Sequence, residues 1–267
     1  MVKAAPASLL PKLLIKIDME NQIDAVIFDL GGTLIEYAGP YLYWPELETP
    51  GLEAAYNYLD ARGITLPPFN RLRDTLFASL PGRWQEATDG KRNLRLVEFL
   101  AEFFQANGLP DLPGEWVAGA AEAYQSTICR RGEIIEGARE TLIALKEQGY
   151  RLGLLSNTMF EGSAHLADLR RFEIDSYFEA MLFSADLNMW KPNAAPYNYL
   201  LDRLGASPGN AVFIGDSPVH DIVGGKGAGL AAIWFQSSDR FGEPDGVQPD
   251  AIIHQLDDLP RLLAHWV

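Results

Sequence analysis

The chain has 267 residues, a formal net charge of −14 and a single cysteine, Cys129. About half of the residues are hydrophobic and 22% are charged, which is typical of a globular protein of one or two domains. The acidic balance argues against a nucleic-acid partner, because phosphate backbones bind to basic surfaces. A single cysteine excludes a disulfide framework within the chain and fits a cytoplasmic location. No apolar stretch is long enough to span a bilayer, so we expect no membrane partner.

The N-terminal segment, residues 1–20, carries a short apolar run that is interrupted by Pro11, Lys12 and Lys16. This run is too short and too broken to act as a signal peptide. We therefore expect residues 1–20 to form an extension outside the folded core.

Short apolar runs that are typical of buried strands recur along the rest of the chain. They cover residues 25–28, 152–155, 180–183, 211–214, 231–235 and 251–253. Continuous apolarity, without alternation, indicates strands that are covered on both faces of a parallel sheet. Helix-length patterns separate the later runs, at residues 138–148, 194–204 and 218–228. This alternation predicts a doubly wound α/β core with a parallel sheet, made of residues 21–36 and 137–267.

The segment 37–136 interrupts this alternation directly after the first expected strand. Its apolar patterns predict four helices, at residues 53–62, 70–80, 94–107 and 115–129. An all-helical insertion of this length is most simply a second, smaller domain. Three tryptophans fall in it, and we expect Trp44, Trp84 and Trp116 to be core residues rather than a platform for a ligand.

The first candidate site directly follows the first expected strand. The sequence there runs from Phe28 through Asp29 and Leu30 to Gly31, Gly32 and Thr33. A carboxylate at the carboxyl end of a parallel strand stands where open α/β sheets bind ligands. The alternative is a tight turn in which Asp29 caps the next element.

An acidic pair follows a later strand, at Asp216 and Asp221. Ser217 is a good helix N-cap and Pro218 a good first helical residue, which places Asp221 about one turn into the helix. Carboxylates that converge on one point repel each other unless a cation lies between them. Together with Asp29, this pair therefore predicts a divalent ion bound by oxygen ligands, most simply Mg²⁺. The alternative is a capping aspartate and a surface aspartate.

Two further features are ordinary loop chemistry when taken alone. Ser156 and Asn157 follow the expected strand 152–155, and Lys191 precedes Pro192. A residue before proline is held extended, so Lys191 is expected to present a fixed positive charge near the start of the next helix.

The order of these features resembles the four motifs of the haloacid dehalogenase superfamily. The resemblance covers residues 24–34 and 137–235, and the helical insertion lies where one subfamily carries a helical cap. It implies that Asp29 is the nucleophile and forms an aspartyl phosphate, and that Ser156 and Lys191 bind the phosphoryl oxygens. The resemblance also implies that Thr33 and Asn157 bind the substrate. The metal ligands implied are Asp29, the carbonyl of Gly31, Asp216 and Asp221, with Mg²⁺ as cofactor and a small phosphorylated metabolite as substrate.

The sequence departs from the family pattern at Gly31. Phosphatases of this superfamily carry an aspartate at that position, which protonates the leaving group and later activates water. Glycine keeps the carbonyl for the metal but removes the acid, which typically contributes about 10²–10⁴-fold to the rate. We therefore expect slow hydrolysis of alkyl phosphates.

Three alternatives to a phosphatase stay open at this point. Haloacid dehalogenases lack this aspartate and need no metal, but they also lack the Gly215–Asp216 pair. Phosphonoacetaldehyde hydrolases have alanine there and use a cap lysine, for which only Lys91 is available. A non-catalytic, regulatory relative is the third. The oligomeric state is left open by the sequence.

Overall fold

The structure is a computed structural model that describes residues 22–37, 44–109, 111–237, 242 and 246–266. The expected N-terminal extension, residues 1–20, therefore lies outside the described residues. Among the described residues, no helix combines the length and the apolarity that crossing a membrane requires.

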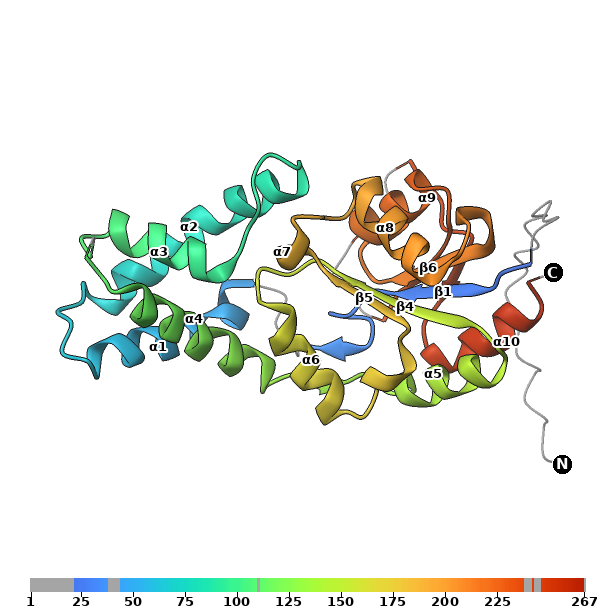
Figure 1. The fold of residues 1–267 in the computed structure, drawn as a ribbon, viewed down its shortest axis with the longest axis horizontal. Helices are drawn as coiled ribbons and strands as arrows, with labels where there is room; N and C mark the ends of the chain where they lie inside the picture. Colours follow the sequence, from blue (N-terminus) through green and yellow to red (C-terminus); the bar gives the residue numbers. More distant parts are fainter. Residues whose placement is uncertain (1–21, 38–43, 110, 238–241, 243–245, 267) are drawn as a thin grey trace, which may run out of the picture.

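A six-stranded parallel sheet forms the centre of the larger part of the molecule (Figure 1). Its order is β5–β4–β1–β6–β7–β8, and every neighbouring pair is parallel. The strands are β1 (Ala25–Phe28), β4 (Arg151–Ser156), β5 (Ala180–Phe183), β6 (Ala211–Gly215), β7 (Ala231–Phe235) and β8 (Ala251–Ile253). All six expected strands are present, and the predicted doubly wound α/β class is confirmed. Because β1 lies between β4 and β6, the residues that follow these three strands meet at one edge of the sheet.

Helices cover both faces of this sheet, which explains the continuous apolarity of the strands. Val26 and Phe28 of β1 belong to the apolar core shared with α5 (Ala138–Glu147), α6 (Gly162–Arg171) and α10 (Leu259–Ala264). The intervening residues, Ala25 and Ile27, pack with α8 (Ala194–Leu204) in a separate cluster. Alternate residues of one strand are thus buried on opposite faces. The short helix α7 (Ser184–Leu187) follows β5.

The segment between β1 and β4 forms a helical part (Figure 1), whose apolar core also includes Met159, Phe160 and Trp190 of the sheet part. Its helices are α1 (Trp44–Asp60), α2 (Phe69–Thr88), α3 (Leu96–Ala106) and α4 (Gly114–Cys129). A two-stranded antiparallel ribbon, β2 (Ile35–Glu36) and β3 (Glu133–Ile134), joins it to the sheet part. Because most of this apolar cluster comes from the four helices, we retain as a proposal the division into residues 37–136 and a core of 21–36 and 137–267.

Two helices of this part are longer than the sequence pattern predicts. Helix α1 starts at Trp44 and passes through Pro50 and Gly51, and α2 continues past Pro81. A Cβ atom at Gly51 would lie 2.6 Å from Cδ1 of Tyr124, so the glycine permits close approach of α1 to α4. Tertiary packing here outweighs the low helix propensity of glycine and proline.

The expected helix over residues 218–228 is also different. The chain forms a π-helical turn, η3 (Pro218–Val223), and then a short helix, α9 (Gly224–Gly227). Ser217 caps the turn as predicted, since its hydroxyl accepts a hydrogen bond from the backbone N–H of His220. The glycine run allows close packing, because a Cβ atom at Gly224 would lie 2.9 Å from Cα of Pro192.

Candidate active site

Three predicted carboxylates converge at the carboxyl edge of the sheet. Asp29 follows β1, Asp216 follows the adjacent strand β6, and Asp221 lies in η3. Carboxylate oxygens of all three lie within 4.8 Å of one another. All three side chains are buried, with exposures of 7%, 9% and 0%. The parallel pairing of β1 with β6 brings together residues that are far apart in the sequence.

Lys191 supplies the positive charge of this cluster. Its Nζ atom donates to Oδ1 of Asp29 at 2.6 Å and to Oδ1 of Asp221 at 2.7 Å. Burial of the side chain works against the ammonium charge, but attraction to Asp221 and Asp29 outweighs it and raises the pKa of Lys191. Lys191 is therefore a fixed cation in contact with the predicted nucleophile.

Asp29 is less acidic than an ordinary aspartate. Burial raises its pKa to about 6; Lys191 lowers this pKa, and Asp221 raises it. Three carboxylates against one ammonium group leave the four side chains with a formal charge of −2. Since the donors are hard oxygens, this set fits a divalent cation such as Mg²⁺.

The two aspartates after β6 are held differently. Asp221 accepts from Lys191 through Oδ1 and from the backbone N–H of Ser217 through Oδ2, at 2.8 Å. The backbone carbonyl of Asp216 accepts a hydrogen bond from Nε1 of Trp234 at 2.9 Å. The carboxylate of Asp221 is thus held by two hydrogen-bond donors, Lys191 and Ser217.

Asn157 has a role that the sequence does not reveal. Its side-chain nitrogen donates to the carbonyl of Lys191 at 2.9 Å, and its side-chain oxygen accepts from the backbone N–H of Lys191 at 2.8 Å. Both ends of the amide therefore position the lysine backbone. These contacts show that Asn157 positions Lys191, and its predicted role in substrate binding stays a prediction.

Two further predicted residues lie beside the cluster. Ser156 is buried at the end of β4, and it lines a cavity of about 130 Å³ together with Asp29, Lys191 and Asp216. Thr33 is fully buried, and its hydroxyl has no hydrogen-bond partner among the described residues. A role of Thr33 in substrate binding stays a prediction.

Gly31 lies in this cavity, and nothing in the backbone requires glycine there. Its φ is not positive, and a Cβ atom would lie 3.7 Å from Cδ2 of Tyr37, an ordinary van der Waals contact. Gly32 is different, because its φ is 82° and a Cβ atom would lie 2.8 Å from Cγ of Asp216. The missing acid is therefore not enforced by the shape of the loop.

A second cavity of about 190 Å³ adjoins the first. Gly31, Trp84, Ser156 and Asn157 line both. The tryptophan comes from helix α2; it packs against the apolar core of the helical part, as predicted, and it also lines both cavities. Its ring packs edge-on against Trp190, with centroids 5.1 Å apart. We name the second cavity the recess.

His220 also lies closer to the site than a solvent-facing helix residue would. It lines the smaller cavity, and its Nδ1 atom is 3.2 Å from the hydroxyl of Ser217. Burial, together with the nearby charge of Lys191, lowers the pKa of His220 to about 4. The imidazole is therefore neutral near pH 7.

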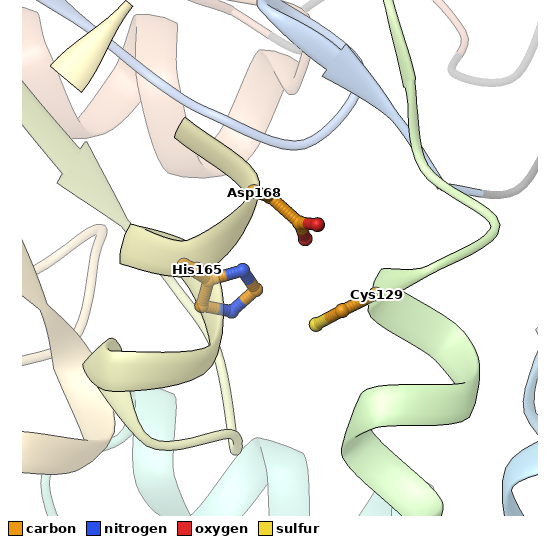
Figure 2. Close-up of side chains that lie close together, drawn as sticks. All are labelled: Cys129, His165 and Asp168. Carbon is orange, nitrogen blue, oxygen red and sulfur yellow. The ribbon is translucent and has the colours of Figure 1, made fainter. Parts of the chain in front are cut away.

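A second buried polar cluster stands beside the recess, and Figure 2 shows its members pointing toward one another. His165 and Asp168 come from α6, and Cys129 ends α4. Their potential ligand atoms lie within 4.8 Å of one another. This cluster was not predicted from the sequence. The three-residue spacing of His165, Asp168 and Arg171, which places them on one helix face, is the only local signal for it that we find.

Hydrogen bonds engage this second cluster on every side. Tyr37 donates to Oδ2 of Asp168 at 3.1 Å, and its hydroxyl lies 3.2 Å from Nδ1 of His165. Nε2 of the same histidine is 2.8 Å from the hydroxyl of Thr158, and Arg171 donates to Asp168 at 2.9 Å. With both ring nitrogens and both carboxylate oxygens engaged, we interpret this cluster as a structural network.

Burial also keeps the network uncharged apart from one ion pair. It lowers the pKa of His165 to about 4, so the ring is neutral at pH 7. It raises the pKa of the Cys129 thiol, which therefore stays protonated. Arg171 balances the charge of Asp168.

The family of the chain follows from comparison with known proteins. The model of the haloacid dehalogenase-like hydrolases matches residues 23–229. Because this match covers most of the chain, including the ends of β1, β4 and β6, the chain belongs to this family of hydrolases.

Individual relatives differ in their named activities. The glyceraldehyde 3-phosphate phosphatase of Pyrococcus furiosus is 28% identical over 149 residues, which are 56% of this chain and 61% of that protein. The chain thus spans about three fifths of the length of this relative. The pyrophosphatase PpaX of Halalkalibacterium halodurans is 27% identical over 249 residues, 89% of this chain and 95% of that protein.

Solved structures show the same fold over nearly the whole chain. A 2-haloacid dehalogenase from Pseudomonas syringae pv. Tomato DC3000 superposes with a TM-score of 0.69 at 25% identity, covering 92% of this chain and all of that one. A phosphatase of the family from Thermococcus onnurineus gives a TM-score of 0.62 at 25% identity, covering 90% and 98%.

Proposed function

We propose that the chain is a Mg²⁺-dependent phosphatase that hydrolyses small phosphate monoesters through an aspartyl phosphate at Asp29. The observation that carries this proposal is the convergence of Asp29, Asp216 and Asp221 on one buried point, with Lys191 bound to the nucleophile. Relatives named as phosphatases for glyceraldehyde 3-phosphate and phosphoglycolate support it.

The residues would divide the reaction as follows. One oxygen of Asp29 attacks phosphorus, the ester P–O bond breaks, and the leaving oxygen takes its electron pair and is protonated from solvent. Water then attacks phosphorus, which releases phosphate and regenerates the carboxylate. Lys191 and Ser156 would bind the phosphoryl oxygens and offset negative charge in the transition state.

A divalent ion would complete the electrostatics of this site. Asp29, Asp216 and the carbonyl of Gly31 would hold it, with Asp221 in or just beyond contact. When bound, Mg²⁺ screens the carboxylates from the anionic substrate and orients the transferred group.

The alternative activities have less support from the described residues. Lys91 is not suited to a Schiff base in a buried site, because its side chain is 69% exposed and paired with Asp89 at 2.8 Å. A metal-free dehalogenase site has no need for the excess of carboxylates around Asp29. A non-catalytic role would leave the buried Lys191–Asp29 contact without a use.

Hydrolysis of phenyl phosphate with and without Mg²⁺ tests the proposal. We expect slow turnover that a chelator abolishes, and that Asp29→Asn lowers by about 10⁴-fold or more, because the nucleophile is lost. Asp24→Asn is a matched control at an exposed carboxylate before β1. Turnover that survives both the chelator and Asp29→Asn would refute the assignment.

A further inference from the structure

The backbone around Lys191 decides where its ammonium group lies. A lysine side chain is flexible, so contacts of 2.6 Å with Asp29 and 2.7 Å with Asp221 require a backbone that does not shift. Asn157 of the sheet part holds this backbone at Lys191 itself. We name residues 190–193 the lysine segment, because the residues beside Lys191 bear on its placement as well.

Trp190, directly before Lys191, is bound by the helical part. Its Nε1 atom donates to Oδ1 of Asn93, in the loop between α2 and α3, at 2.9 Å. Its ring also packs edge-on against Trp84 of α2. The side chain of Trp190 is only 2% exposed, and a buried N–H group without an acceptor is strongly unfavourable. Asn93 therefore supplies a partner that this position requires.

Asn93 is fixed at both ends of its amide. Its Nδ2 atom donates to the backbone carbonyl of Ala185 in α7 at 2.8 Å, and Oδ1 accepts a second hydrogen bond from the backbone N–H of Leu94 at 3.0 Å. An N–H group can only donate and a carbonyl can only accept, so exchanging the amide oxygen and nitrogen would lose all three bonds. Asn93 thus holds residue 190 from the helical part, as Asn157 holds residue 191 from the sheet part.

A second contact lies at the other end of the lysine segment. Nδ2 of Asn193 donates at 2.7 Å to the carbonyl of Thr88, the last residue of α2. The end of α2 and the loop after it therefore bind the lysine segment on both sides of Lys191.

We propose that Asn93 is a positioning residue for Lys191: through the indole of Trp190, the helical part holds the lysine within reach of the transferred phosphoryl group. This inference rests on the proposed phosphatase function, in which Lys191 binds the phosphoryl oxygens. The phosphoryl site is then complete only while the loop between α2 and α3 is docked on the sheet part.

Substitutions on the two sides of the hydrogen bond between Asn93 and Trp190 test the proposal. Asn93→Ala removes the acceptor, and Trp190→Phe removes the donor but keeps a ring against Trp84. We expect each to lower kcat/KM for phenyl phosphate about tenfold, because a small displacement of a catalytic group is costly. The double variant should also lose about tenfold, since both changes break the same bond, whereas independent changes would combine to about 100-fold.

The form of the loss separates positioning from a purely structural role. Lys191 acts on the phosphoryl group, so Asn93→Ala should lower kcat/KM by the same factor for phenyl phosphate and 2-naphthyl phosphate. Its affinity for inorganic phosphate, measured by calorimetry with Mg²⁺, should fall as well. Asn93→Asp keeps an oxygen acceptor for the indole and should retain more activity than Asn93→Ala. A lower melting temperature with unchanged kcat/KM would overturn the proposal.

Glu161→Gln is the matched control. Glu161 of the sheet part pairs with Arg95 of the helical part at 3.6 Å, so this variant weakens another contact between the two parts without touching the lysine segment. Its kcat/KM should equal that of the wild type. A loss as large as that of Asn93→Ala would show that the effect is not specific to the lysine segment, and would also overturn the proposal.

The outcomes distinguish this inference from the proposed function. If the wild type hydrolyses phenyl phosphate and Asn93→Ala is unimpaired, the function stands and the positioning role is overturned. If the wild type binds inorganic phosphate but hydrolyses neither ester, the function fails; a lower phosphate affinity of Asn93→Ala would then support the positioning role, and an equal affinity would overturn it. A wild type that neither binds phosphate nor hydrolyses the esters refutes both.

Discussion

The two buried polar clusters of this protein differ in how their charges are balanced. At the sheet edge, Lys191 faces three carboxylates, and the cluster opens onto a cavity. On α6, Arg171 balances the single carboxylate of Asp168, and hydrogen bonds engage the other polar atoms. Buried carboxylates in excess imply that a cation belongs there, whereas a balanced and fully bonded network stabilises the fold by itself.

The largest expected effect is a difference in stability between variants of the two cluster cations, Lys191 and Arg171. Lys191→Ala leaves the carboxylates of Asp29 and Asp221 buried without their partner, and we expect a loss of about 3–5 kcal/mol in the free energy of unfolding. Arg171→Ala removes a cation that is 40% exposed, and should cost about 1–2 kcal/mol. Urea unfolding in the presence of a chelator measures both. Equal losses would contradict the distinction.

The protonation of His165 gives the next effect. Its pKa is about 4 in the fold against 6.5 in the unfolded chain, so the unfolded state binds more protons between these values. Stability from the neutral ring is complete above pH 6.5 and is lost as the pH falls toward 4. The stability gap between wild type and His165→Gln should shrink by about 3 kcal/mol from about pH 8 to pH 4. A gap that stays constant over this pH range would contradict a buried, neutral His165.

Metal affinity should distinguish the clusters more directly. Asp216→Asn removes a charge from the site proposed for Mg²⁺, and we expect its affinity to fall on the order of 100-fold in a calorimetric titration. Asp221→Asn should lower it less, because Asp221 is already bonded to Lys191 and Ser217. Asp168→Asn, in the α6 network, should leave the affinity unchanged. A comparable loss for Asp168→Asn would mean that the ion binds on α6 instead.

The smallest expected effect concerns the missing acid. Gly31→Asp places a carboxyl group in a loop whose backbone accepts a side chain, since an added Cβ atom makes only an ordinary contact with Tyr37. The ratio of alkyl to aryl phosphate hydrolysis should rise by a factor on the order of ten, since alkyl leaving groups most need a proton. An unchanged ratio in a folded, Mg²⁺-binding variant would show that the acid does not limit turnover.

The strand ends and their order were predictable from the sequence because local signals mark them. Apolar runs end at Phe28, Leu155 and Ile214, and parallel strands necessarily carry the residues that follow them to one edge of the sheet. The pairing of β1 with β6 then brings Asp29 next to Asp216.

Other parts of the site depend on packing between distant segments and leave no local signal. The amide of Asn157 holds Lys191, 34 residues away, and Trp84 reaches the site only through the placement of α2. Tyr37 and Asp168 are 131 residues apart. The predicted start of helix α1 was also wrong. Close packing at Gly51 favours a helix there, although the low helix propensity of glycine would end it.

The network on α6 also bears on how the helical part can move. The chain passes between the sheet part and the helical part twice, and one face of α6 binds both of these connecting segments. Tyr37, in the first segment, donates a hydrogen bond to Asp168. The backbone carbonyls of Cys129 and Gly132, in the second segment, accept hydrogen bonds from Arg171. A swing of the helices would have to break bonds on both crossings together. Both crossing segments are therefore held by the same helix, α6, and we expect them to move together. Loosening the hydrogen bonds of Arg171, which lies outside the described lining of the recess, should therefore change how fast ligands enter and leave it.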